Sequence, residues 1–188
     1  MAAVTSTPTK TRRQSTVAVL LVGAVVALSL GLYGRLHSPS HKTIFTLGFS
    51  GLLQMKAWLT TAAFFFILIQ LLSALWMWNR LPGKPRQPSW LGNLHRWSGS
   101  IGFSLTLPVA FNCIWSLGFL TTTPRVVVHS VAGCLFYGAY AAKMVGLRVR
   151  GLPGWALPVL GGTVFALFLT LWLTAALWLF TRHGIPLT

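Results

Sequence analysis

The stretch Met55–Trp78, MKAWLTTAAFFFILIQLLSALWMW, decides the fold of this chain. It carries one charge, Lys56, and is otherwise apolar apart from a few hydroxyl groups and one amide. An α-helix rises about 1.5 Å per residue, so about 20 apolar residues cross the hydrocarbon core of a bilayer. The stretch therefore predicts a transmembrane helix.

Four further apolar runs of similar length lie on either side of it, and 54% of the 188 residues are apolar. This composition is typical of a polytopic membrane protein and not of a soluble domain. We expect an all-α bundle of five transmembrane helices. The predicted spans lie near 15–34, 55–78, 96–119, 126–147 and 155–181.

The basic residues predict how the bundle is oriented. Counted on alternating sides of the spans, ten Lys and Arg fall on the side of the N-terminus and five on the other. Because cytoplasmic loops carry the excess of positive charge, we expect the N-terminus inside a bacterial plasma membrane. The ten are Lys10, Arg12, Arg13, Arg80, Lys84, Arg86, Arg96, Lys143, Arg148 and Arg150, and the five are Arg35, Lys42, Lys56, Arg125 and Arg182.

The segments outside the spans are read from their composition. Residues 1–14 are rich in Thr, Ser and basic side chains and are predicted to be a disordered basic tail, before a membrane domain of residues 15–181 and an outer tail of residues 182–188. Residues 37–54 are too polar to cross and too apolar for a free loop, so we expect a short surface helix or re-entrant piece. The Pro- and Gly-containing segment 79–94 predicts an extended linker.

The chain contains no Asp and no Glu, and its formal charge is +15. This excludes a Ser-His-Asp triad, a paired-carboxylate glycosidase, a carboxylate-bound Mg or Ca site and a carboxylate proton relay. The basic residues lie between apolar runs, which argues against nucleic acid and favours anionic lipid or an acidic partner. Cys113 and Cys134 lack metal-site spacing and are interpreted as small buried residues.

Two predicted helices begin with the same signature, His95-Arg-Trp-Ser-Gly99 and His129-Ser-Val-Ala-Gly133. An imidazole inside a membrane is costly unless it is paired, coordinated or turned to a polar interior, so it indicates a functional site. The glycine four residues later lies on the same helix face and leaves room beside the ring. A flat macrocycle such as haem needs such room.

The spacing places these residues in two layers. Asn112 lies about 25 Å beyond His95, and Lys143 lies about 21 Å beyond His129 on an antiparallel helix. His95 is therefore level with Lys143, and His129 is level with Asn112. This is the plan of a membrane cytochrome with b-type haem, in which iron is commonly held by His.

The ligands of such a haem are incomplete in the sequence. For an outer haem we expect His129 to pair with His41, or alternatively with His37, if the outer segment folds over the bundle, whereas His95 has only Lys143 at its level. Arg125 and Arg96 are placed to bind haem propionates, although basic residues at helix ends are also ordinary interface anchors. Hydrogen bonding of His95 and His129 across helices is the alternative interpretation.

A resemblance supports the membrane assignment. The residues that carry it are Met55-Lys-Ala-Trp58, His95-Arg-Trp-Ser-Gly99, Leu107-Pro-Val-Ala110, Val128-His-Ser130, Gly133-Cys134, Phe136-Tyr-Gly138, Lys143-Met144 and Leu152-Pro-Gly-Trp-Ala-Leu-Pro158. Over about residues 40–181 the chain resembles an actinobacterial integral-membrane family of unknown function. Its helix arrangement is loosely similar to the haem-b proteins that include ascorbate-reducible cytochromes and ferric reductases, which implies His95 and His129 as candidate ligands.

Three functions follow from these observations. The first is a subunit with b-type haem that transfers electrons across or within the bilayer, with a redox partner, and it would be an enzyme only as part of a membrane oxidoreductase. The second is a cofactor-free subunit that anchors or assembles a larger complex. The third is a small transporter that uses His129 and Lys143 along a polar path.

Overall fold

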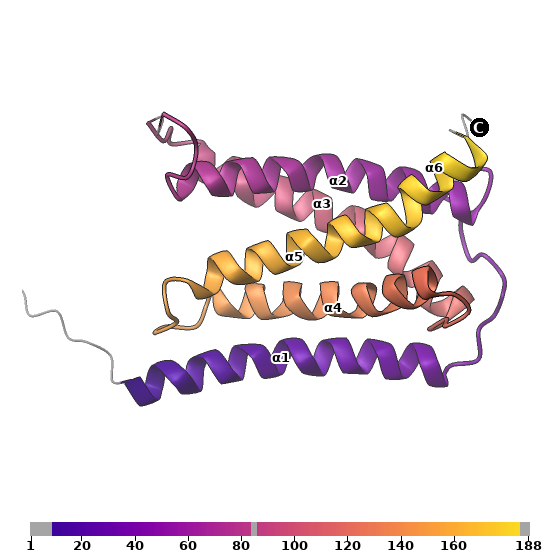
Figure 1. Cartoon of the computed structure of the whole chain (residues 1–188), viewed down its shortest axis with the longest axis horizontal. Coiled ribbons are helices and arrows are strands. Elements are labelled where there is room, and N and C mark those ends of the chain that lie inside the picture. Colours follow the sequence, from indigo (N-terminus) through magenta and orange to yellow (C-terminus); the bar gives the residue numbers. More distant parts are fainter. Residues whose placement is uncertain (1–8, 84–85, 185–188) are drawn as a thin grey trace, which may run out of the picture.

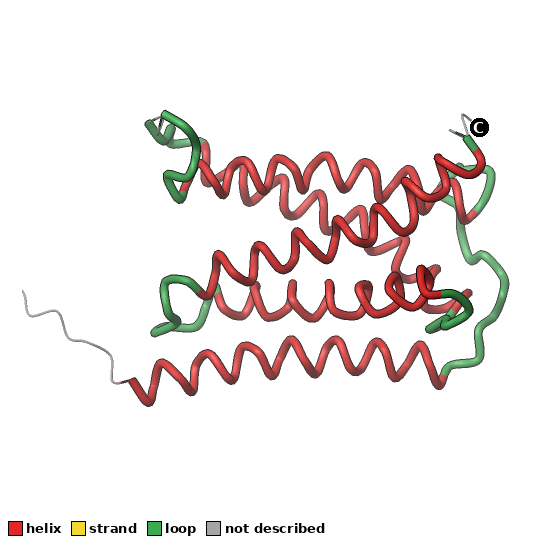
Figure 2. The backbone as a smooth tube through the Cα atoms, in the orientation of Figure 1, coloured by secondary structure: helices red, strands yellow, loops and turns green. Residues whose placement is uncertain are grey.

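Five long helices lie side by side in the computed structural model, which describes residues 9–83 and 86–184 (Figure 1). All five are long and apolar enough to cross a membrane, and the described residues contain no strand (Figure 2). The predicted all-α, five-helix fold is confirmed. The helices are α1 (Thr9–Leu36), α2 (Leu52–Met77), α3 (Leu91–Asn112), α4 (Pro124–Gly146) and α5 (Ala156–Trp172).

Two of the long helices contain a segment of π-helix. After α3 the chain continues as η1 (Cys113–Leu117), and after α5 it continues as η2 (Leu173–Leu177) and then α6 (Trp178–His183). Pro108 lies inside α3 and cannot donate the backbone hydrogen bond of an ordinary helical residue, so the helix is already weakened one turn before η1.

The helices are arranged in pairs. α2 packs along α3, and α5 and α1 each pack along α4, so that α4 and α5 lie between α1 and the α2–α3 pair (Figure 1). We call the end that holds residues 37–51 and α6 the distal end, and the end where α1 begins the proximal end. The sequence predicts that the distal end faces outside, and this orientation stays a prediction.

Glycines set the close approach of α1 to α4. A Cβ atom added to Gly23 would lie 2.8 Å from the carbonyl oxygen of Gly138 and 3.0 Å from Cβ of Ala142. The two backbones touch only because both positions lack a side chain, which is a common way to pack helices in membranes. α1 exposes much of its remaining surface, including Leu20, Val25 and Leu28.

The centre of the bundle is aromatic. Phe136 of α4 and Phe168 of α5 are almost fully buried, with ring centroids 5.5 Å apart. Phe64 of α2 stacks on Trp172 of α5 with centroids 4.7 Å apart. These contacts join α2 to the α4–α5 pair at mid-height.

The structure differs from two expectations about the segments outside the predicted spans. α1 begins at Thr9, inside the segment 1–14 for which we expected disorder, because Lys10, Arg12 and Arg13 are good helix formers that extend the apolar helix. The part of that expectation on residues 1–8 lies outside the described residues, as does the outer tail beyond Gly184.

Residues 37–51, for which we expected a short surface helix or a re-entrant piece, form an irregular loop without a helix. The loop is bound to the distal end of α3 and η1, where the buried Asn112 accepts a hydrogen bond from the backbone N–H of Ile44 at 3.2 Å. Ser116, also buried, donates to the carbonyl of Lys42 at 2.8 Å. Because these side chains satisfy the loop's backbone groups, the loop needs no helix of its own.

Candidate functional site

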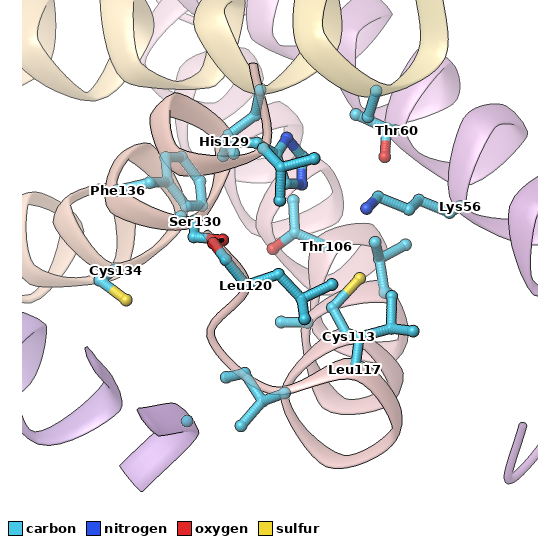
Figure 3. Close-up of a pocket in the computed structure, with 18 of the residues that line it drawn as sticks. Lys56, Thr60, Thr106, Cys113, Leu117, Leu120, His129, Ser130, Cys134 and Phe136 are labelled. Atoms are coloured by element: carbon cyan, nitrogen blue, oxygen red, sulfur yellow. Dashed lines mark hydrogen bonds between the residues drawn. The ribbon is translucent and has the colours of Figure 1, made fainter. Parts of the chain in front are cut away.

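A cavity of about 300 Å³ lies in the distal half of the bundle, between the α2–α3 pair and α1, α4 and α5. Figure 3 shows Lys56, Thr106, Cys113 and His129 pointing toward a common space from three helices. The volume is at the lower end of the roughly 300–1,000 Å³ typical of small-molecule sites.

The N-terminal cap of α4 fixes the height of His129 in the wall of this cavity. Pro124 occupies the first turn, where its missing N–H costs nothing, and the side chain of Thr123 accepts a hydrogen bond from the backbone N–H of Val126 at 3.3 Å. His129 therefore lies about 7.5 Å below the start of the helix.

Hydrogen bonds hold the His129 ring in one orientation. Its Nδ1 lies 2.8 Å from Oγ1 of Thr174 in η2. The Thr174 hydroxyl itself donates to the carbonyl of Thr170 at 2.6 Å, so it accepts from Nδ1–H of His129. In the neutral ring the proton is then on Nδ1 and the lone pair is on Nε2. Among the described residues Nε2 has no hydrogen-bond partner, and the ring lines the cavity.

Two cations lie at the same height. Lys56 of α2 points into the cavity opposite His129, and no described side chain forms a hydrogen bond with its ammonium group (Figure 3). The guanidinium of Arg125 lies 3.8 Å from the centroid of the Trp178 ring and donates to the carbonyl of Thr174. Arg125 is thus already engaged, whereas Lys56 is available to a ligand.

The cavity is charged near the distal end and mainly apolar deeper in the bundle, where the hydroxyl of Tyr137 donates a hydrogen bond to that of Thr106. Lys56 and Arg125 lie within about 6 Å of the helix starts, whereas Phe136 lies about 18 Å from the start of α4. Phe168 and Leu171 of α5 line the same deep region as Phe136. We call this apolar region the floor.

Both π segments border the cavity. Cys113, Ile114 and Leu117 of η1 form one wall, and Ala175 of η2 lies on another. A π segment widens a helix locally and is frequent at functional sites. The η2 segment also presents Thr174, which orients His129.

The structure does not bring His95 into this cavity. Nδ1 of His95 lies 2.8 Å from Oγ of Ser73, and that hydroxyl donates to the carbonyl of Ile69 at 2.7 Å. Gln70 donates to Oγ of Ser98 at 2.9 Å and also to the carbonyl of His95. His95 is therefore part of a polar cluster between α2 and α3, about one bilayer leaflet away from His129.

The remaining residues proposed from the sequence are dispersed. Gly133 and Arg125 line the cavity, whereas Gly99 lies against Gln70 in the α2–α3 cluster. His41 is exposed in the distal loop and Arg96 is exposed at the proximal end. Lys143 is partly buried near the proximal end of α4, the end of the bundle that also holds His95.

Sequence reasoning missed Lys56 and Thr174 as site residues. Lys56 was counted only as a charge at the end of a span, although it is the one charge in the segment Met55–Trp78, which is a recognisable signal. Thr174 gave no signal, because a lone hydroxyl in an apolar helix is common and its partner is 45 residues away in the chain.

A comparison with known protein families gives a match over residues 16–187. The chain belongs to the family of unknown function DUF6529. No curated protein and no solved structure matches the chain. The expectation of a family of unknown function is thus confirmed, and similarity to haem-b cytochromes is not supported.

The described residues do not fit a haem held by two histidines. His129 is the single histidine among the described residues that line the cavity, and His41 is exposed on the distal loop. Among the described residues no group of three or more His, Cys, Asp or Glu is placed to hold a metal ion. The site therefore offers one imidazole, one available ammonium group, several hydroxyls and an apolar floor.

Proposed function

We propose that this protein binds an anionic amphiphile, a hydrocarbon chain with a phosphate or carboxylate head group, in the distal cavity. The observation that carries the proposal is the ammonium group of Lys56, which points into a largely apolar cavity without a partner among the described residues. The sequence led us to expect an interaction with anionic lipids, and the proposal assigns that interaction to the distal cavity.

The charge balance favours an anion. A cation in a low-dielectric environment is costly unless an opposite charge or hydrogen-bond acceptors compensate it. The sequence has no side-chain carboxylate, so this chain cannot supply an ion-pair partner to Lys56 from its side chains. An anionic head group from outside the chain would supply it, and basic pockets between membrane helices commonly bind such groups.

The polarity gradient favours an amphiphile over a free anion. Near the distal end the cavity offers Lys56 and Thr60 as hydrogen-bond donors and Nε2 of His129 as an acceptor for a protonated phosphate oxygen. The floor of Phe136, Phe168 and Leu171 would bury the first carbons of a chain, at about 0.8 kcal/mol per CH₂. A free anion would gain nothing from that floor.

The test is equilibrium binding of radiolabelled dodecyl phosphate to the protein in nanodiscs of neutral lipid, with inorganic phosphate measured in parallel. Lys56→Gln should weaken dodecyl phosphate binding on the order of 10-fold to 100-fold, because it removes a charge-assisted hydrogen bond. Lys56→Arg, which keeps the charge, should retain most of the binding.

Lys42→Gln is the matched control, because it removes the same charge from an exposed loop position at the same end of the bundle. It should bind like the wild type. Equal losses in Lys42→Gln and Lys56→Gln would indicate nonspecific surface attraction and contradict the proposal. Tight binding of inorganic phosphate without preference for the alkyl chain would contradict the role of the floor.

A b-type haem with His129 as its one histidine ligand is the second candidate. It is favoured by the lone pair of Nε2, which is turned to the cavity. It is also favoured by the space at Gly133, where an added Cβ atom would have Leu171, at 3.9 Å, as its nearest neighbour. Such a group would supply one-electron chemistry, and the chain would hold its iron. A reduced-minus-oxidised visible spectrum of protein from haem-replete cells, lost in His129→Ala, would establish it, whereas a colourless wild type would exclude it.

A further inference from the structure

A second cationic group lies on the far side of the cavity floor, in the gap between α3 and α4. Lys143 of α4 lies one turn beyond Tyr140, whose ring stacks on Phe103 of α3, and His95 lies on α3 at the same end of the bundle. As in the distal cavity, an imidazole is held through Nδ1 by a hydroxyl of a neighbouring helix, and a lysine lies at the same end of the bundle. We call Lys143 and His95 the proximal pair, and Lys56 and His129 the distal pair.

The proximal pair resembles the distal pair in its available ammonium group. Among the described residues, no side chain or backbone group forms a hydrogen bond with the ammonium group of Lys143, whereas the His95 ring is hydrogen-bonded within the α2–α3 cluster. The sequence contains no acidic side chain that could neutralise Lys143. The same kind of head group would therefore be stabilised at both heights of the membrane.

Side chains, not backbone contacts, close the gap between the two pairs. Phe103 of α3 stacks on Tyr140 of α4 with ring centroids 3.8 Å apart and planes 5° apart. Phe103 also meets the edge of Tyr137, whose hydroxyl lies 2.9 Å from Oγ1 of Thr106. We call Phe103, Tyr137 and Tyr140 the aromatic barrier.

The barrier lies at mid-membrane and joins both sites. Tyr137 and Thr106 line the distal cavity from below, and Lys143 follows Tyr140 by three residues on the same face of α4. Phe103 lies about 18 Å from the start of α3, near the middle of a bilayer core about 30 Å thick. Because these ring contacts join α3 and α4 at this height, rotation of the three side chains would open a passage here.

We propose that the gap between α3 and α4 is a route along which the anionic head group crosses the bundle, from the distal pair past the aromatic barrier to the proximal pair. This inference rests on the proposed binding of an anionic amphiphile and extends it to transfer between leaflets. The distal cavity is the resting site, and the proximal pair holds the head group only in transit.

The test is transfer of dodecyl phosphate, carrying a nitrobenzoxadiazole group at its chain end, between the leaflets of liposomes that contain the protein. Dithionite added outside bleaches the probe in the outer leaflet, and a potassium ionophore prevents a membrane potential from opposing the transfer. The wild type should transfer the probe faster than protein-free liposomes. Lys143→Gln should slow this transfer about tenfold while equilibrium binding at the distal cavity changes less than about twofold.

Two further variants distinguish the expected loss of transfer from a loss caused by misfolding. Arg148→Gln removes an exposed charge at the same end and should transfer like the wild type. Phe103→Ala should accelerate transfer, because it opens the barrier, and a loss of folding cannot produce that gain while binding is retained.

The results that would overturn the route, the role of the proximal pair and the proposed function can be told apart. Wild-type transfer no faster than in protein-free liposomes, with binding intact, would overturn the route and leave the proposed binding function standing. Normal transfer by Lys143→Gln would overturn the role of the proximal pair. Absence of dodecyl phosphate binding to the wild type would overturn the proposed function itself.

Discussion

The two histidine-glycine signatures of this chain are alike in sequence and in hydrogen bonding, yet His129 and Gly133 line the distal cavity and His95 and Gly99 do not. His95 and His129 each lie near the start of a helix. His95 donates Nδ1–H to the hydroxyl of Ser73, and His129 donates Nδ1–H to the hydroxyl of Thr174, in both cases on a neighbouring helix and at 2.8 Å. The rings alone therefore do not decide where a ligand can bind.

The difference lies in what occupies the space beside the glycine. A Cβ atom added to Gly99 would lie 3.0 Å from three atoms of the Gln70 side chain, whereas one added to Gly133 would meet only Leu171, at 3.9 Å. The side chain of Gln70 fills the space beside Gly99, and from there it donates hydrogen bonds to Ser98 and to the carbonyl of His95. The neighbouring helix thus decides whether the motif makes a packed helix contact or an open site.

The largest expected effect is a difference in stability between the two glycines. Gly99→Leu should lower the free energy of unfolding by about 1–3 kcal/mol, because the new side chain displaces Gln70 from its hydrogen bonds. Gly133→Leu should change it by less than about 1 kcal/mol, since the cavity accepts the side chain and leucine is the better helix former. Unfolding in mixed micelles of increasing SDS content measures both values.

Ligand binding should respond in the opposite order. Gly133→Leu fills part of the distal cavity and should abolish binding of dodecyl phosphate, whereas Gly99→Leu should leave binding to the folded fraction unchanged. Equal stability losses for the two variants would contradict the contrast drawn between the two glycines.

A double-mutant cycle isolates the role of Gln70. Gly99→Ala alone should be destabilising, because its Cβ meets the end of the Gln70 side chain, and Gln70→Ala alone should be destabilising through the lost hydrogen bonds. Together they should cost less than the sum, with a favourable coupling of about 0.5–3 kcal/mol. SDS titration of the four proteins measures the coupling, and strict additivity would show that Gln70 does not occupy the space beside Gly99.

The sequence predicted the helices better than the site. Five helices follow from apolar runs longer than a bilayer is thick, and this signal is local and strong. Whether a residue such as Asn112 binds a neighbouring helix or a loop depends on tertiary contacts. It is bound to residues 67 and 68 positions away in the chain, at Phe45 and Ile44, which no local pattern reveals.

The motif pointed to both histidines but could not rank them. The identity of Gln70 as the side chain beside Gly99 requires the register between α2 and α3, and the sequence does not contain that register in any simple periodicity. Lys56 shows the converse case, since a lone charge in an apolar segment was visible from the start, but its direction into the cavity was not.

The smallest expected changes in stability come from removing the hydroxyls that orient the two histidine rings. Ser73→Ala and Thr174→Val each remove one hydrogen bond between helices, and each should lower stability by only about 0.6 kcal/mol, the average for such bonds in membranes. Their effects on the distal cavity should differ. Thr174→Val releases the ring that turns Nε2 of His129 toward the ligand, so dodecyl phosphate should bind severalfold more weakly, about as expected for loss of one neutral hydrogen bond. Ser73→Ala acts about a leaflet away and should leave the affinity unchanged, so an equal weakening by both variants would show that general loosening of the bundle, and not the orientation of His129, governs binding.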